Sequence, residues 1–413
     1  MHLLSIPRHQ IETTLADYAG IAASLLTRRE GAGAIAAFER DFADYVGCRH
    51  AIAVASGRLG MHLVLEALEI GPGNEAIIPA FNLFAVVERF CQLGLIPRFC
   101  DIRGDDLNID ASAAERLVTS KTRIVLATHM FGHPAAMDAL TAMARQRKLI
   151  LLEDCAHALG SRFAGKFVGT LGTAAIFSFS VLKLVTTFGG GMIATNDGAL
   201  AASIRKRLES LRESQPCPRG VKKALMGAIM DIGTRRLPFS FGAWPMLRLA
   251  RMLRPGLQQK IMTETPRRDR GFHPEETPPL HPFQARLGRG QLHRVGELIE
   301  RRRRVGQWLD EELDGIPHIR LVQSAGGGTW NGLYYGILAN RAAELSQHLF
   351  SKGIDCETSE YHNCADLDLY RDHAVDCPVA REVQSQIIRL PNFPAMTQRD
   401  VRRVGSAIRR FYA

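Results

Sequence analysis

One stretch of the chain, residues 149–158, has the sequence LILLEDCAHA. Its first four residues are apolar and Asp154 follows shortly after them, a pattern typical of a buried parallel strand that carries a carboxylate to the edge of a sheet. A second apolar stretch, AAIFSFSVLK at residues 174–183, ends in an isolated lysine, Lys183. Because ligands of parallel sheets bind at the carboxyl ends of the strands, we expect Asp154 and Lys183 in one site.

The residues around this stretch repeat a strand-helix-strand pattern. Short apolar runs predict further strands at 51–55, 76–79, 98–101 and 123–127, and residues 59–68 read as the helix after the first of them. Such continuous apolar runs indicate parallel strands covered by helices on both faces. The sequence therefore predicts an α/β domain with a mostly parallel sheet.

The remainder of the chain predicts a smaller lobe. Its helices are expected at 291–313, 342–352 and 398–411 and its strands at 334–338 and 386–390, whereas a helix at 196–213 is expected to lead out of the large domain. A chain of 413 residues exceeds one hydrophobic core, so we expect two lobes. We place an N-terminal segment and the large domain at 1–213, an insertion at 214–280 and a small α+β domain at 281–413.

The charge of the chain is concentrated in the insertion. The formal net charge is +10, and residues 214–271 alone contain twelve Lys/Arg against three Asp/Glu. The rest is close to neutral, which argues against a nucleic-acid partner.

The cysteines and the N-terminus indicate the compartment. Eight cysteines are scattered without a C-x-x-C pair, which predicts neither a metal site nor a disulfide framework. We read no signal peptide and no spanning segment, and therefore expect a cytoplasmic protein.

A lysine and a carboxylate at one sheet edge are what pyridoxal 5′-phosphate (PLP) needs: an amine to form a Schiff base, and an acid that keeps the ring nitrogen protonated. Lys183 is flanked by apolar residues, and buried lysines are rare unless they have a function. Ser56 and Gly57 at a strand-to-helix turn offer N–H groups to the phosphate, and Ser178 offers a hydroxyl. The glycines at 189–191 allow the backbone to turn closely beside a ligand.

The order of these motifs resembles the DegT/DnrJ/StrS family of PLP-dependent sugar aminotransferases, which have fold type I. The resemblance covers about residues 30–212 and 280–411. It is carried by Ser56-Gly57, by GPGNE at 71–75, by HMFGHP at 129–134, by EDCAHA at 153–158, by FSF at 177–179 with Lys183, and by LPNFP at 390–394.

The resemblance implies a role for each matched residue. Lys183 would form the Schiff base and move the proton, Asp154 would pair with the pyridinium, and His157 would lie near the ring hydroxyl. Gly57, Arg58 and Ser178 would hold the phosphate, in an active site at the interface of a homodimer. Structural alternatives stay open: a helix cap for Asp154, a core histidine for His157 and a sheet hydroxyl for Ser178. His129 and His133 are further candidates.

Three positions depart from the family pattern. Arg58 stands where a threonine is usual, and a guanidinium also suits a phosphate. Leu83 replaces an aromatic residue over the cofactor, so Phe81 or Phe84 would reach the ring instead, or an aliphatic face suffices. The stretch at 277–280 replaces an asparagine that reaches the partner's cofactor phosphate, for which His281 or a basic residue of the insertion would substitute.

The insertion has a pattern of its own. Arginines recur at 248, 251 and 254 between apolar residues, which predicts an amphipathic helix with a basic strip. One interpretation is peripheral contact of residues 219–260 with an anionic inner membrane surface, or a lid over an acidic or lipid-linked substrate. The other is a helical excursion with solvated arginines.

The resemblance therefore implies a PLP-dependent aminotransferase that moves an amino group, from L-glutamate as the expected donor, to a nucleotide-linked keto sugar. One alternative is a non-sugar or lipid-linked ketone as acceptor. Another is a non-catalytic regulatory or membrane-associated protein that retains the fold. We expect no metal.

Overall fold

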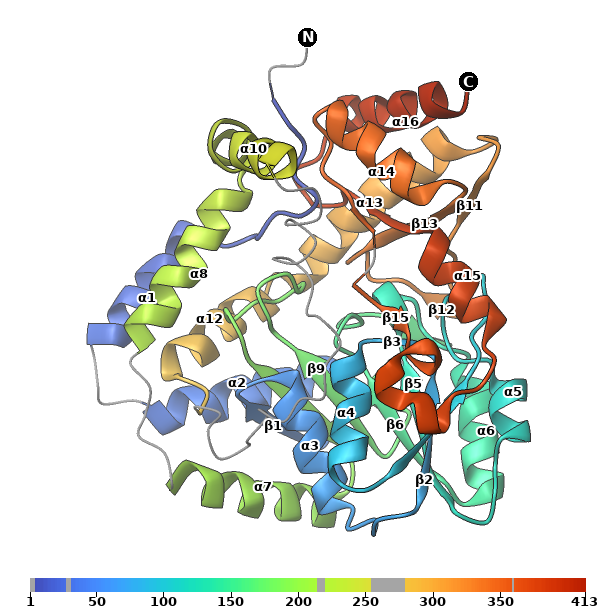
Figure 1. Ribbon diagram of the computed structural model, residues 1–413. Coiled ribbons are helices and arrows are strands. Elements are labelled where there is room, and N and C mark those ends of the chain that lie inside the picture. The colour runs from blue at the N-terminus through green and yellow to red at the C-terminus, as the bar shows by residue number, and fades with distance from the viewer. Residues whose placement is uncertain (1–3, 27–30, 214–219, 254–278, 359) are drawn as a thin grey trace.

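The computed structural model describes residues 4–26, 31–213, 220–253, 279–358 and 360–413 (Figure 1). A seven-stranded sheet forms the centre of the large lobe. Its strands, in spatial order, are β1 (His50–Val54), β10 (Gly191–Thr195), β9 (Ala174–Ser178), β6 (Ile150–Asp154), β5 (Thr122–Thr128), β2 (Glu75–Pro79) and β4 (Ile96–Cys100).

Six of these strands run in one direction, and β10 alone is antiparallel to its neighbours β1 and β9. Sequence analysis did not predict β10, because its short apolar run follows three glycines. The consequence for the site is that the loop between β9 and β10, which carries Lys183, lies at the carboxyl ends of the six parallel strands. The mostly parallel sheet is confirmed.

Helices cover both faces of the sheet. One core contains Ile52 and Val54 of β1 with residues of α3 (Gly57–Ala67), α4 (Phe84–Gln92) and α7 (Gly198–Glu213). The opposite core contains Ala51 and Ala53 of β1 with residues of α2 (Gly31–Val46), α5 (Ala111–Arg116), α6 (Met137–Arg147) and α12 (Pro282–Leu292). Alternate residues of one strand thus enter different cores, as the pleat of a strand requires.

The small lobe is built on a four-stranded antiparallel sheet, in the order β11 (Ile319–Leu321), β13 (Tyr335–Ala339), β16 (Ile387–Leu390) and β14 (Glu357–Thr358). Its core joins α13 (Val295–Leu313), α14 (Ala342–Ser351) and α16 (Gln398–Tyr412). α15 (Pro378–Gln386) packs instead with the large lobe. There are two smaller sheets. One joins β12 (Gly328–Thr329), β7 (Arg162–Phe163) and β8 (Lys166–Phe167), and the other pairs β3 (Phe81–Asn82) with β15 (His362–Asn363).

The helix predicted at 291–313 is two helices. α12 ends at Leu292 and α13 begins at Val295, because the backbone of Arg294 leaves the helical region at φ −115°. α12 packs with α2 in the core of the large lobe, whereas α13 begins in that same core at Val295 and ends in the core of the small lobe at Leu313. The domain boundary at 281 stays a prediction.

The N-terminal segment and the insertion lie together at one side of the molecule (Figure 1). Near the N-terminus, Ile6 forms a bridge to Ile354 of the small lobe, and α1 (Leu15–Leu26) follows. The described part of the insertion forms α8 (Gly220–Thr234), α9 (Arg236–Pro238), η3 (Phe239–Ala243) and α10 (Trp244–Leu253). Of the helices that the structure describes, none combines the length and apolar character needed to cross a bilayer.

Candidate functional site

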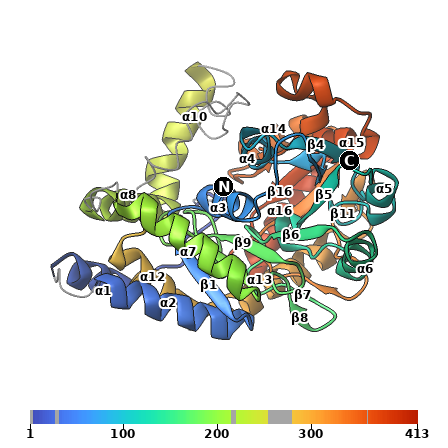
Figure 2. The ribbon, with the colours of Figure 1, turned by 90° about the horizontal axis from the view of Figure 1, so that it is seen from below.

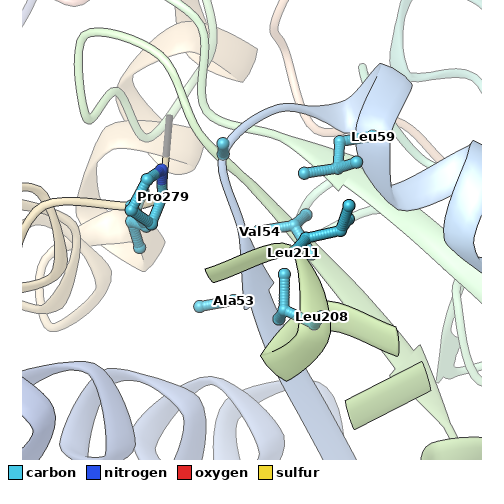
Figure 3. A pocket seen from close by; sticks show the side chains of 8 residues that line it. Ala53, Val54, Leu59, Leu208, Leu211 and Pro279 are labelled. Atoms are coloured by element: carbon cyan, nitrogen blue, oxygen red, sulfur yellow. The ribbon is translucent and has the colours of Figure 1, made fainter. Parts of the chain in front are cut away.

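A cleft of about 490 Å³ opens at the carboxyl ends of the parallel strands. Its polar lining brings together residues far apart in the sequence, including Ser56, Asp154, His157, Ser178 and Lys183. A second hollow, between β1 and α7, has only apolar lining such as Val54, Leu208 and Pro279 (Figure 3). Of the two, only the cleft has the convergent polar groups of a ligand site, and the hollow is a packing feature.

Lys183 lies in the loop between β9 and β10. Burial lowers the pKa of its amine to about 8, although the carboxylates of Glu360 and Asp154 act in the opposite direction. The Nζ atom lies 5.7 Å from the centre of the Tyr334 ring, whose hydroxyl donates a hydrogen bond to the Leu182 carbonyl at 3.1 Å. At pH 7 about one tenth of the amine is therefore in the neutral, nucleophilic form.

Two glutamines of α12 fix the loop that carries Lys183. Gln291 exchanges two hydrogen bonds with the backbone of Thr186, accepting from its N–H at 2.9 Å and donating to its carbonyl at 2.8 Å. Gln284 donates to the carbonyls of Thr187 and Gly189. Because the side chains of both glutamines are buried, water does not compete for these hydrogen bonds, and they fix the loop on α12.

Asp154 ends β6 and is 7% exposed. Its Oδ1 accepts a hydrogen bond from the Ala156 N–H at 3.0 Å. Burial raises the pKa of Asp154, against this hydrogen bond and the positive charge of Lys183. A buried carboxylate in this position is favoured in its ionised form by a cation, which is what the protonated nitrogen of a pyridine ring would supply. The donor set therefore fits PLP.

His157 is held as a neutral ring. Its Nδ1 accepts a hydrogen bond from the Phe131 N–H at 3.3 Å, so the Nε2 atom carries the proton and donates to the Tyr361 hydroxyl at 2.8 Å. Burial lowers the pKa of His157 well below its ordinary value, with the charges of Lys183 and Arg389 acting in the same direction. The ring lines the cleft beside Asp154 and is available for contact with a bound planar ring.

Backbone from two segments forms a cradle beside Ser178. The Ser56 hydroxyl caps α3 by accepting from the Leu59 N–H at 3.1 Å. A Cβ added to Gly191 would lie 2.8 Å from the Gly57 nitrogen, so the glycine allows the two backbones to meet. The helix N-terminus and the Ser178 hydroxyl line the cleft together with the exposed side chain of Arg58. This arrangement suits a phosphate.

The structure places Phe81 outside this lining. Phe81 pairs with Asn363 between β3 and β15, and its buried ring lies 6.0 Å from that of Tyr361. Leu83 and Val86 line the cleft in its place, so the aliphatic alternative accounts for the wall. Strand pairing turns the Phe81 side chain into the core, so the structure does not bring it to the cleft, and contact of Phe81 with the cofactor stays a prediction.

The other histidines of the predicted site have structural partners. His133 stacks on Trp330 at 5.3 Å, and its Nδ1 atom lies 2.9 Å from the Ser324 hydroxyl. The His281 side chain caps α12. His129 lines the cleft, but its two ring nitrogens bond to the Ala135 N–H and to Glu153.

Among the described residues, His129, Glu153 and Cys155 lie close enough to hold a metal ion. The Glu153 carboxylate, however, accepts from the N–H groups of Gly169, Leu171 and Gly172 at 2.6 to 2.8 Å as well as from His129. Burial also raises the pKa of the Cys155 thiol well above its ordinary value, which disfavours a thiolate ligand. We assign this group to the packing of β6.

Sequence reasoning missed a charged cluster behind the cleft. The guanidinium of Arg389 is 2.5 Å from Glu357 and lies over the Tyr334 ring at 4.5 Å. Arg89, fully buried on α4, lines the cleft itself. Arg389 is a single charge within an apolar run, the same signal that drew attention to Lys183, whereas Arg89 directly follows Glu88. Glu360 and Tyr361 also line the cleft, whereas His362 pairs with Asn82.

Comparison with known proteins identifies the family. The model of the DegT/DnrJ/EryC1/StrS aminotransferase family matches residues 20–223 and 278–409. The chain belongs to this family. It is therefore an enzyme of a PLP-dependent aminotransferase family, as the motif order predicted. The match stops at 223 and resumes at 278, so most of α8 and all of α10 lie outside the family pattern.

Relatives of known function or structure cover nearly the whole chain. GDP-perosamine synthase of Caulobacter vibrioides is 30% identical over 91% of this chain and 89% of its own. The structure of S. venezuelae DesV in complex with a ketimine intermediate is 26% identical, with a TM-score of 0.75 over 96% of this chain and 94% of that one. The aminotransferase TlmJ of Streptoalloteichus hindustanus, at 23% identity and a TM-score of 0.77 over 98% of both chains, shares the fold.

Proposed function

We propose that this enzyme binds PLP at Lys183 and transfers an amino group, from L-glutamate as donor, to a keto sugar carried by a nucleotide. The observation that carries the proposal is one cleft that joins a low-pKa lysine, a buried carboxylate and a glycine-lined helix N-terminus. The substrate class rests on the GDP-perosamine synthase relative, 30% identical.

PLP supplies an aldehyde for amines and a ring that withdraws electrons from the carbon beside the nitrogen. The residues of this chain would bind and orient it. Lys183 Nζ, with its pKa lowered to about 8, would act as the nucleophile toward the cofactor aldehyde and would then move a proton between the substrate Cα and the aldehyde-derived carbon of the cofactor. Asp154 would hold the proton on the ring nitrogen.

The phosphate would lie in the cradle at Gly57, where the N-terminus of α3, the Arg58 guanidinium and the Ser178 hydroxyl meet. His157, neutral and fixed by Tyr361, would keep the ring in position by contact without adding charge. Leu83 and Val86 would exclude water from the other wall. These roles make the site residues testable one at a time.

Two expectations from the sequence remain proposals: a homodimer, because active sites of the resembling family lie at a subunit interface, and a cytoplasmic location. Light scattering of the purified enzyme tests the first. A twofold chain mass is expected, and a monomer with full activity would refute it.

One alternative acceptor is favoured by a specific observation. The described insertion presents an exposed apolar surface, which suits a lipid-linked ketone. The non-catalytic alternative is set aside, because the chain is an enzyme of its family.

The experiment is an acceptor panel with the purified holoenzyme and L-glutamate. GDP- and TDP-linked 4-keto sugars, the free sugars and a lipid-linked ketone would be compared, with the amino product measured by mass spectrometry and Lys183→Ala as the control. Turnover confined to the nucleotide sugars supports the proposal. Turnover of the lipid-linked ketone alone would replace the acceptor and leave the cofactor site in place.

A further inference from the structure

Helix α8 faces outward with apolar side chains. Val221, Leu225, Met226, Ile229 and Ile232 have exposed fractions between 52% and 61%. The side that contacts the protein carries small or polar residues instead, namely Gly220, Ala224, Gly227 and Asp231. A helix in contact with water normally has the opposite arrangement.

The same property continues through η3 and α10. Phe241 is 68% exposed, Met246 73%, Leu249 56% and Met252 79%. Eleven of the fourteen exposed large hydrophobic residues in the described chain lie between Val221 and Met252. Single exposed apolar residues are ordinary, but a concentration of this kind marks an interaction surface. We call these residues of α8 to α10 the outer face.

Polar contacts fix the orientation of the outer face. Asp231, fully buried, accepts hydrogen bonds from Thr13, Tyr18 and Arg235. Further along, Arg236 forms an ion pair with Asp400, and the Arg251 guanidinium lies 3.6 Å from the centre of the Phe350 ring. Of the arginines expected in the basic strip, Arg251 packs on the small lobe and Arg248 is exposed. Because these polar residues of the helices bond to the rest of the protein, the apolar side chains face outward.

The charge of this surface has one sign. Between residues 220 and 253 the only acidic residue is Asp231, which is buried and paired, whereas Lys222 and Arg248 are exposed. We propose that the outer face docks on the surface of an anionic lipid membrane, with its apolar side chains among the acyl chains and its cations at the headgroups. Interfacial helices bind by this combination of apolar area and basic charge.

A second copy of this chain suits the outer face less well. A symmetric contact would bring Lys222 and Arg248 of both copies into one interface in which residues 220–253 offer no exposed acid to pair them, and like charges oppose such a contact. Figure 2 shows α8 and α10 at the margin of the molecule, with α10 extending away from the main sheet. The inference does not depend on the proposed acceptor.

The test is sedimentation of the holoenzyme with vesicles, without substrate. Phosphatidylcholine vesicles would be compared with vesicles that contain a third phosphatidylglycerol. We expect binding to the anionic vesicles that weakens with salt. Two variants, Lys222→Glu with Arg248→Glu and Met246→Ser with Leu249→Ser and Met252→Ser, should each need at least about tenfold more lipid for half-binding.

Matched controls lie elsewhere on the surface. Arg303→Glu with Arg304→Glu changes two exposed cations of α13, and Val375→Ser changes an exposed apolar residue. Both should bind as the unchanged enzyme does, and every variant should keep its aminotransferase rate. Unimpaired vesicle binding by the outer-face variants, or none by the unchanged enzyme, would overturn the proposal. So would conversion of these variants to monomers, which would assign the outer face to a subunit contact.

Discussion

The pKa of Lys183 predicts how the enzyme without cofactor captures PLP as the pH changes. Only the neutral amine attacks an aldehyde, so the capture rate follows the unprotonated fraction of Lys183. At pH 7 that fraction is about one tenth for a pKa of about 8, against about 0.03% at the ordinary value of 10.5, a difference of about 300-fold. The rate should rise with pH and level off above about pH 9.

The assay is rapid mixing of the apoenzyme with PLP from pH 6 to 10, followed by the absorbance of the lysine-bound cofactor. The same series with N-acetyl-lysine methylamide corrects for titration of PLP itself. After correction, a midpoint near 8 is expected. A rate that still rises tenfold per pH unit at pH 10 would refute the burial argument, because it would give Lys183 the pKa of a solvated lysine.

Glu360 provides the structural control. Its carboxylate is the strongest of the neighbouring charges that raise the pKa of Lys183, so Glu360→Gln should move the midpoint below that of the unchanged enzyme. Glu311→Gln, an exposed position on α13, should leave the midpoint where it is. Equal midpoints in all three proteins would separate Glu360 from the titration of the lysine.

Three further predictions concern residues in and around the cleft. Gly191→Ala places a methyl group 2.8 Å from the Gly57 nitrogen and should weaken PLP binding at least about tenfold in equilibrium titration, whereas Gly233→Ala, with open space around it, should not. Arg389→Met removes one of the two arginines that pair with the buried Glu357 carboxylate and leaves Arg8 in place, so it should lower the free energy of unfolding by about 2 kcal/mol in urea, and an unchanged value would contradict that. Tyr361→Phe removes a buried hydrogen bond and should cost about 1 kcal/mol in the same assay, with unchanged stability as the contrary result.

The sequence was sufficient where one strand or loop carried the signal. Asp154 and Lys183 each interrupt or end an apolar run, and the parallel sheet brings such ends to one edge. The glycines at 189–191 likewise indicated a close approach, which the contact between Gly191 and Gly57 explains. Strand positions shifted by a residue or two, which leaves the predicted alternation of strand and helix intact.

The sequence was insufficient where a role depends on a distant partner. Phe81 looked available for the ring, and only its pairing with Asn363 turns it away. Tyr361 is joined to the site by a hydrogen bond to His157, which lies 204 positions earlier in the sequence. The arginines at 248, 251 and 254 were expected to form a basic strip, and a helical pattern does not show that Arg251 packs on Phe350. Arg254 lies outside the described residues.

The most direct test of the central claim is borohydride reduction of the PLP-loaded enzyme followed by peptide mass mapping, with L-glutamate added to an unreduced sample. The account predicts a phosphopyridoxyl group on Lys183 and on no other lysine, and loss of the absorbance band of the lysine-bound cofactor when glutamate is added. A label on Lys183 without that loss would keep the cofactor site and reject glutamate as donor. A label elsewhere, or none, would contradict the account.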